Sequence, residues 1–208
     1  MRRNMLPRRL FLIAAIGLGL TPSPEVHAQS AVDRASSFVK ATGDQLVGVV
    51  NGPGSHPQKR QELTRIIDRS VDVDGVARFC LGRFWRQASA DQQKRYLDLF
   101  HEVLVTNITS KLGEYRGVKF TMGRAVQEGD AVRVSTTVER PNNSPTAVDW
   151  LIDSPASNPK IVDVIAEGTS LRLTQRQDYA SYLTHNGNNI DALISAMRQQ
   201  VNQGQASG

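Results

Sequence analysis

The chain has 208 residues, of which 39% are hydrophobic and 22% are charged, a composition that fits a globular domain with one core. Its 25 Lys and Arg and 20 Asp and Glu residues give a net charge of +5. The sequence has no long basic run and no interleaving of basic and aromatic residues, so we expect no nucleic acid partner. Mild positive charge is compatible with transient contact with an anionic membrane surface.

Residues 1–28 have the pattern of a secretory signal peptide. Four arginines precede an apolar stretch at 10–20, which is too short to span a bilayer comfortably. We expect cleavage after Ala28 and a periplasmic location; an uncleaved anchor is the alternative. The Arg8-Arg9 pair leaves both the Sec and the twin-arginine export routes open. Without this leader the chain has 21 basic and 19 acidic residues, a net charge of +2.

The first half of the remaining chain has the spacing of helices. Apolar residues predict a helix over 31–51, which ends in a Gly- and Pro-rich stretch. A second helix is expected over 57–71, and a short third one follows Asp72. Ser89 is a good N-cap for the longest helix, which we expect to continue to Leu112. Its apolar residues form more than one stripe, so more than one side should be covered.

After residue 117 the apolar residues alternate with polar ones, which predicts strands. Four strands are expected, at 118–122, 132–138, 148–152 and 160–166. Short turns between them indicate an antiparallel meander with one buried face. Helices are then expected over 170–183 and 190–201.

The order of elements predicts the fold class. We expect an α+β domain in which helices pack on one face of a curved four-stranded antiparallel sheet. Residues 29–202 should form this single domain, and 203–208 a flexible tail.

The sequence lacks the spacings of common metal and catalytic sites. Its four histidines form no HxxxH or HExxH pattern, and there is no GxSxG motif or glycine-rich phosphate loop. We therefore expect no metal, no cofactor and no catalytic residue. Cys80, the single cysteine, has apolar neighbours that predict a buried thiol. Asp149, Asp153, Asp163 and Glu167 keep one alternative open, an enzyme that uses a buried carboxylate.

Two stretches carry motifs that are more specific than the element order. The first is VDGVARFCLGRFWRQASADQQKRYLDLF, residues 73–100, which includes Arg83, Trp85 and Arg86. The second is VDVIAEGTSLRLTQR, residues 162–176, which includes Asp163, Glu167, Gly168 and Ser170. Both resemble motifs of the MlaC family of periplasmic phospholipid-binding proteins, also called the toluene-tolerance auxiliary family. Together with the leader and the element order, the resemblance covers essentially the whole chain after residue 28.

The resemblance implies an NTF2-like α+β cone and a carrier rather than an enzyme. Such a carrier moves phospholipid between an outer-membrane lipoprotein complex and an inner-membrane ABC transporter complex, and so maintains outer-membrane lipid asymmetry. We expect a monomer, and a hopanoid-associated carrier of the same family is an alternative. Thr169 stands where the family usually has valine, a residue of similar shape.

A phospholipid carrier must shield acyl chains, because each methylene left in water costs about 0.8 kcal/mol. We therefore expect an apolar cavity between the helices and the sheet. The residues expected to line it are Phe100, Val103, Leu104, Val132, Val134, Thr136, Val138, Val148 and Trp150.

The second motif predicts the corner between the last strand and the next helix. We expect the carboxylate of Glu167 to accept N–H bonds from this turn, and Gly168 to supply a backbone shape closed to other residues. Ser170 should cap the helix, and Asp163 should pair with an Arg or Lys of a neighbouring element. Together with Arg83 and Trp85 of the first motif, we interpret these residues as structural; direct contact with lipid or a partner is the alternative.

Overall fold

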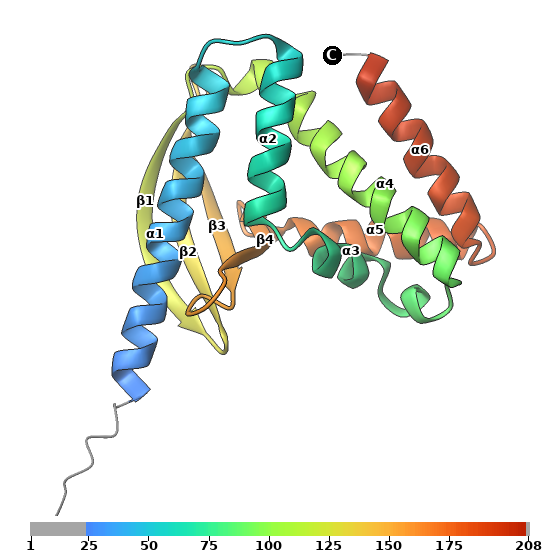
Figure 1. Ribbon diagram of the computed structural model, residues 1–208, viewed down its shortest axis with the longest axis horizontal. Coiled ribbons are helices and arrows are strands. Elements are labelled where there is room, and N and C mark those ends of the chain that lie inside the picture. The colour runs from blue at the N-terminus through green and yellow to red at the C-terminus, as the bar shows by residue number, and fades with distance from the viewer. Residues whose placement is uncertain (1–23, 207–208) are drawn as a thin grey trace, which may run out of the picture.

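The computed structural model describes residues 24–206 and contains an antiparallel sheet, a long helix that lies along it, and a bundle of helices beside it (Figure 1). The helices are α1 (Pro24–Asn51), α2 (His56–Ser70), α3 (Val73–Leu81), α4 (Ala90–Thr109), α5 (Leu171–His185) and α6 (Ile190–Ala206). Two 3-10 turns are η1 (Gly82–Arg86) and η2 (Leu112–Tyr115). The strands are β1 (Lys119–Glu128), β2 (Ala131–Glu139), β3 (Thr146–Asp153), β4 (Lys160–Ala166) and β5 (Thr169–Ser170).

The two ends of the chain extend beyond the expected helix bounds. Most of the expected leader, up to residue 23, lies outside the described residues, and α1 begins at Pro24, before the expected cleavage point. At the other end α6 continues to Ala206, past the expected end at Val201. None of the helices between residues 24 and 206 is long and apolar enough to cross a membrane.

Side-chain caps fix the helix starts. The Ser89 hydroxyl accepts the N–H of Gln92 at 3.2 Å, and the Gln92 side chain accepts the N–H of Ser89 at 3.0 Å, a reciprocal capping box that confirms Ser89 as the N-cap of α4. Asp72 caps α3 by accepting the N–H of Gly75 at 3.1 Å. These caps satisfy N–H groups that have no partner within the helix.

The sheet confirms the α+β class and has one strand more than expected. Its order is β1-β2-β3-β4-β5, and all neighbouring strands are antiparallel. β5 has two residues, so it is too short to show an alternating pattern in the sequence. The turn before β5 contains Glu167 and Gly168, both with positive φ, as a tight hairpin turn of type I′ requires.

α1 covers part of the inner face of the sheet. Ala35 and Val39 of α1 pack against Val132 and Val134 of β2, in a core cluster that also contains Ile152 and Ile161. These strand residues share one face because side chains alternate along a strand. The buried face is therefore the one that the alternation predicted.

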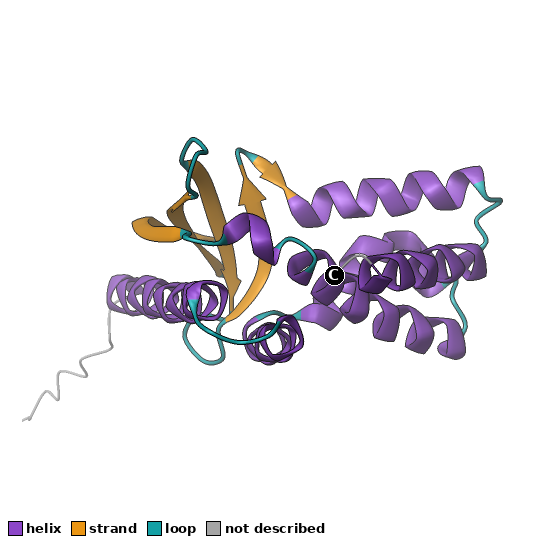
Figure 2. Cartoon of the chain, turned by 90° about the horizontal axis from the view of Figure 1, so that it is seen from above, coloured by secondary structure: helices purple, strands orange, loops and turns teal. Residues whose placement is uncertain are grey.

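The later helices differ from the expected arrangement, because they lie beside the sheet and not on its face (Figure 2). Many of their apolar side chains are buried against one another. Their core cluster is formed by α3, η1, α4, α5 and α6, with Tyr96, Phe100 and Tyr179 in mutual ring contact. The wide apolar surface of α4 is thus covered by other helices. An apolar stripe along a helix predicts that this face is buried, but it does not predict which element packs against it.

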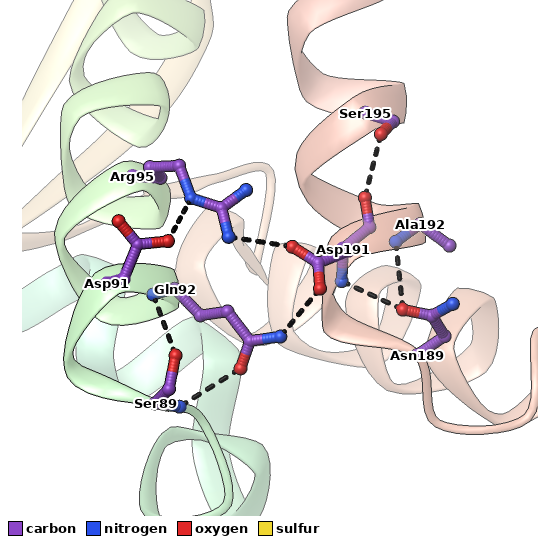
Figure 3. Close-up of polar contacts among 8 residues, drawn as sticks. All are labelled: Ser89, Asp91, Gln92, Arg95, Asn189, Asp191, Ala192 and Ser195. Carbon is purple, nitrogen blue, oxygen red and sulfur yellow. Dashed lines mark hydrogen bonds and ion pairs between the residues drawn. The ribbon is translucent and has the colours of Figure 1, made fainter.

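A polar network joins α4 to α6 at one edge of this bundle (Figure 3). Arg95 contacts Asp91 at 2.7 Å and Asp191 at 2.8 Å, and the Gln92 amide donates to Asp191 at 2.8 Å. The hydrogen bond from Gln92, together with that from Arg95, lowers the pKa of Asp191. Asn189 accepts the N–H of Asp191 at 3.0 Å, which caps the start of α6.

Candidate functional site

A cavity of about 270 Å³ lies where α1, α2, the end of α4, η2 and the sheet meet. Leu46, Val47 and Val50 of α1 form one wall, and the buried Leu63 of α2 continues it. Val50 follows Leu46 and Val47 by one helical turn, so the three residues lie on one side of the helix. They follow, along the same helix, the residues that pack on the sheet core.

Gly43 lies in α1 between the part that packs on the sheet and the part that lines the cavity. The ring of Phe120 lies so close that a Cβ at position 43 would be 2.6 Å from it. The missing side chain therefore lets the β1 aromatic ring approach the helix backbone.

The sheet forms the opposite wall through Phe120, Val138 and Trp150. The indole N–H of Trp150 donates to the Thr136 hydroxyl at 2.9 Å, and this hydroxyl donates to the carbonyl of Val148 at 2.8 Å. Both polar groups are thereby satisfied, as buried groups must be. The ring is held by a hydrogen bond and presents its apolar surface to the cavity.

The third wall comes from the end of α4 and from η2, and it opens to solvent. Asn107, Ile108 and Lys111 are exposed residues of the lining, and 39% of the Ile108 surface is accessible. Tyr115 of η2 is half-buried, and the guanidinium carbon of Arg140 lies 5.1 Å from its ring centroid. The exposed residues mark the mouth of the cavity, and Lys111 is its charged lining residue.

The structure places two of the expected lining residues, Val138 and Trp150, at this cavity. Three others lie elsewhere on the same sheet face: Val132 and Val134 in the core under α1, and Thr136 beneath Trp150. Phe100 and Val103 belong to the core of the helical bundle. Leu104 and Val148 are half-buried outside the lining.

The lining contributed by α1 and η2 escaped the sequence reasoning. Leu46 and Val50 have helical spacing, which is equally typical of residues in a solid core. Lys111 directly precedes η2 and Tyr115 is its last residue, and this short 3-10 turn has no periodic apolar pattern. No signal in these segments separates the wall of a cavity from ordinary packing.

At the corner between β4 and α5, Asp163 is the central residue. It is only 7% exposed, and it accepts the Ser170 hydroxyl at 2.6 Å and the Arg172 N–H at 3.2 Å. The side-chain Nε of Arg172 lies 3.3 Å from the same carboxylate, which is the expected ion pair. Ser170 also caps α5, since its hydroxyl accepts the N–H of Leu173 at 3.1 Å.

Glu167 does not have the expected role. Its side chain is exposed, and the carboxylate that accepts an N–H from the following helix is that of Asp163. Glu167 contributes through its backbone, which has φ of 50° and donates to the Ala147 carbonyl at 3.1 Å. Gly168 has φ of 80°, the left-handed conformation that was expected of it.

The first motif spans α3, η1 and the first half of α4, and its Arg83, Trp85 and Arg86 lie in η1. Trp85 is half-buried against the bundle core, and its carbonyl accepts the Gln93 amide at 2.9 Å. The guanidinium carbon of Arg78 lies 5.3 Å from the Trp85 ring, and that of Arg83 lies 4.9 Å from the Phe84 ring. These contacts fix the loop between α3 and α4, away from the residues of the cavity lining.

Cys80 is buried in the bundle with 1% of its surface exposed, as its neighbours predicted. Burial raises the pKa of its thiol from 9.0 to about 12, because a thiolate would lose its hydration there. The Sγ atom lies 3.5 Å from the carbonyl of Arg172. A neutral thiol in this position is a packing group.

The other ionisable candidates lie away from the cavity lining. Asp149 follows Val148 on the opposite face of β3 and pairs with Arg133 at 3.4 Å. His101 contacts Asp68 at 2.6 Å, between α4 and α2. Over residues 24–206, no three His, Cys, Asp or Glu side chains gather in a way that would hold a metal ion.

Comparison with known proteins identifies relatives of this chain. The toluene tolerance protein ttg2D of Pseudomonas putida is 25% identical over 141 residues, which cover 67% of this chain and 66%, just under two thirds, of that protein. The intermembrane phospholipid transport system binding protein MlaC of Haemophilus influenzae is 21% identical over 93% of this chain and 88% of its own length.

Among solved structures, a phospholipid-binding protein from Ralstonia solanacearum, in complex with a phospholipid, has a similar fold. The TM-score is 0.69 at 23% sequence identity, over 82% of this chain and 98% of that one. The model of the family described as MlaC protein matches residues 40–199, which include the cavity lining and both motifs. This chain therefore belongs to the MlaC family.

Proposed function

We propose that this protein is a periplasmic carrier that binds phospholipid in the cavity between α1, η2 and the sheet. The observation that carries the proposal is an apolar cavity with an open mouth, in a member of a family whose relatives include a phospholipid transport protein. Each acyl methylene left in water costs about 0.8 kcal/mol, so a lipid in transit must be enclosed.

The chemistry of the lining favours a carrier over an enzyme. Among the described residues that border the cavity, none is Asp, Glu, His, Cys, Ser or Thr, so the lining holds no carboxylate, imidazole, thiol or aliphatic hydroxyl for acid–base or nucleophilic catalysis. Aliphatic and aromatic side chains dominate the walls. Binding without reaction is the function that such a lining supports.

The cavity must widen to hold two acyl chains. Its volume of about 270 Å³ lies below the roughly 300–1,000 Å³ of sites for drug-sized ligands, and a diacyl lipid is larger than these. The seam between α2 and α4 is suited to open, since Arg60 donates to the hydroxyls of Thr106 and Thr109, and His56 contacts the Thr109 carbonyl at 3.2 Å. Water can replace such polar contacts at a small net cost.

The carrier would act as a monomer and move lipid between an outer-membrane lipoprotein complex and an inner-membrane ABC transporter complex. The expected leader supports export, and the name of the Haemophilus relative supports an intermembrane transport system. In this role the protein would help to maintain the lipid asymmetry of the outer membrane.

The test is the lipid content of the native protein. The full chain is expressed with its own leader, the periplasmic fraction is purified without detergent, and an organic extract is analysed by mass spectrometry. We expect about one diacyl phospholipid per protein, and Val138→Trp should reduce this content. A protein free of lipid, which also takes up none from phospholipid vesicles, would contradict the proposal. A hopanoid in place of phospholipid would assign the chain to the hopanoid-associated branch.

A further inference from the structure

We propose that Lys111 and Arg140 bind the phosphate of the lipid headgroup at the mouth of the cavity, so that the protein selects phosphate-bearing lipids over neutral lipids with the same chains. This inference rests on the proposed lipid-binding function and assigns the orientation of the lipid: the headgroup at the end of α4, the chains toward α1 and the sheet.

The first observation is how polarity is distributed over the lining. Its exposed residues are Asn107, Ile108 and Lys111, all from the end of α4 and the residues just after it. The α1, α2 and sheet walls are apolar. A bound amphiphile aligns its polar end with the polar, hydrated end of its site, so the headgroup belongs at this mouth.

The second observation is that two cations without a carboxylate partner lie at this part of the lining, one as a lining residue and one against the ring of a lining residue. Lys111 borders the cavity, and Arg140 lies over the ring of Tyr115, which also borders it. Within the described part of the chain, neither Lys111 nor Arg140 forms an ion pair. By contrast, Arg133 on the outer face of the sheet has two acidic partners, Glu128 and Asp149.

The backbone cannot replace these side chains. The mouth lies at the C-terminal end of α4, where carbonyl groups rather than N–H groups are left over. The helix dipole is negative at this end, so it repels an anion. A phosphate bound here must be neutralised by side chains, and Lys and Arg form charge-assisted hydrogen bonds with phosphate oxygens.

The stacking of Arg140 on Tyr115 gives this cation a defined position. A guanidinium over an aromatic ring keeps the edge of its planar group free to donate. Tyr115 therefore links the two functions of the site, because its ring borders the apolar space and also positions a phosphate donor at the mouth.

The experiment compares two probes with identical acyl chains, phosphatidic acid and diacylglycerol, each with a fluorescent label at the end of one chain. Dissociation constants are measured for the delipidated full-length mature protein and for Lys111→Gln, Arg140→Gln and the double variant. Lys119→Gln is the matched control, since Lys119 is exposed in β1 and does not border the cavity. Melting curves establish that each variant is folded.

We expect the wild-type protein to prefer phosphatidic acid, and each single variant to reduce this preference about fivefold, the size of a moderately exposed ion pair. Diacylglycerol binding should stay unchanged, and the preference should weaken as salt is added. A preference that is unchanged in the folded double variant would overturn the proposal and leave the carrier function standing. Binding of neither probe by the wild-type protein would instead refute the carrier function.

Inorganic phosphate is the third probe, because the same cations would attract a free anion. We expect excess inorganic phosphate to leave diacylglycerol binding unchanged and to weaken phosphatidic acid binding only slightly, since the acyl chains hold the lipid phosphate at the mouth. Equal affinity for inorganic phosphate and for phosphatidic acid would mean an anion site unrelated to the lipid, and would overturn the assignment.

Discussion

Val134 and Trp150 are direct cross-strand partners in β2 and β3 and pack in the same core, but only Trp150 also borders the cavity. Val134 is fully buried under α1, whereas the Trp150 ring borders the cavity. The two side chains lie on the same face of the sheet, and α1 covers only part of that face. The boundary between core and cavity therefore runs across one pair of strands.

This boundary predicts opposite results for the same substitution at two positions of β2. Val138→Trp adds an indole to a residue of the cavity lining, so the protein should remain folded while its bound phospholipid falls sharply. Val134→Trp adds the same group to a closed core and should lower the free energy of unfolding by about 1–3 kcal/mol. Melting temperature and lipid content, read from one purification of each variant, test the pair. A folded Val138→Trp protein with a full lipid load would remove Val138 from the proposed site.

Gly43 and Gly48 in α1 form a second matched pair. A Cβ at Gly43 would meet the ring of Phe120 at 2.6 Å, so Gly43→Ala must displace this ring or the helix. We expect Gly43→Ala to lose about 1–3 kcal/mol of stability and to change the lipid content, because Gly43 and Phe120 both border the cavity. Gly48 has open space around its Cβ position, and Gly48→Ala should stabilise the helix by about 0.5–1 kcal/mol. Chemical denaturation measures the free energy of unfolding of each variant. Equal changes in Gly43→Ala and Gly48→Ala would contradict the proposed close packing of Phe120 on Gly43.

Asp163 should contribute more to stability than to lipid binding. Asp163→Ala removes the charge partner of the Arg172 guanidinium and leaves the Arg172 backbone N–H and the Ser170 hydroxyl without their acceptor, at a cost of about 3 kcal/mol in unfolding free energy. Asp163→Asn keeps an acceptor oxygen and should cost less. Asp149→Asn, on the exposed face of β3, should cost about 0–1 kcal/mol. If Asp163→Asn had an unchanged melting curve but no lipid, Asp163 would be a ligand contact instead.

Cys80 should react slowly with thiol reagents in the native protein. Its pKa of about 12 keeps the thiol neutral, so native alkylation at pH 9 should be far slower than alkylation in urea.

The raised pKa of the Cys80 thiol also predicts a loss of stability in alkali. Below pH 9 the thiol is neutral in both states; from pH 9 to 12 only the unfolded state ionises, which costs about 1.4 kcal/mol per pH unit. Cys80→Ala, unfolded over the same pH range, should show a shallower decline, and equal slopes would contradict the assignment.

The sequence by itself determined the elements and much of their local chemistry. Ser89, Asp72 and Ser170 cap helices as their types predict, because a cap depends on residues within one turn. The alternation in β2 and β3 identified the buried face of the sheet, since the pleat fixes which side chains share a face. Cys80 is buried because its apolar neighbours on α3 are buried with it.

Only the tertiary structure decided what covers each of these faces. Periodicity reports that a side chain is buried, but a core and a cavity require the same apolar residues, so Val134 and Val138 look alike in the sequence. Phe100 and Val103 were expected at the cavity, but they face other helices, because the direction in which α4 crosses the molecule follows from long-range packing. Asp163 rather than Glu167 accepts the N–H bond at the corner, because the positive φ of Glu167 reverses the chain and brings Ser170 and Arg172 back beside β4. A two-residue strand such as β5 has no period to detect, and it exists only because β4 provides the edge on which it pairs.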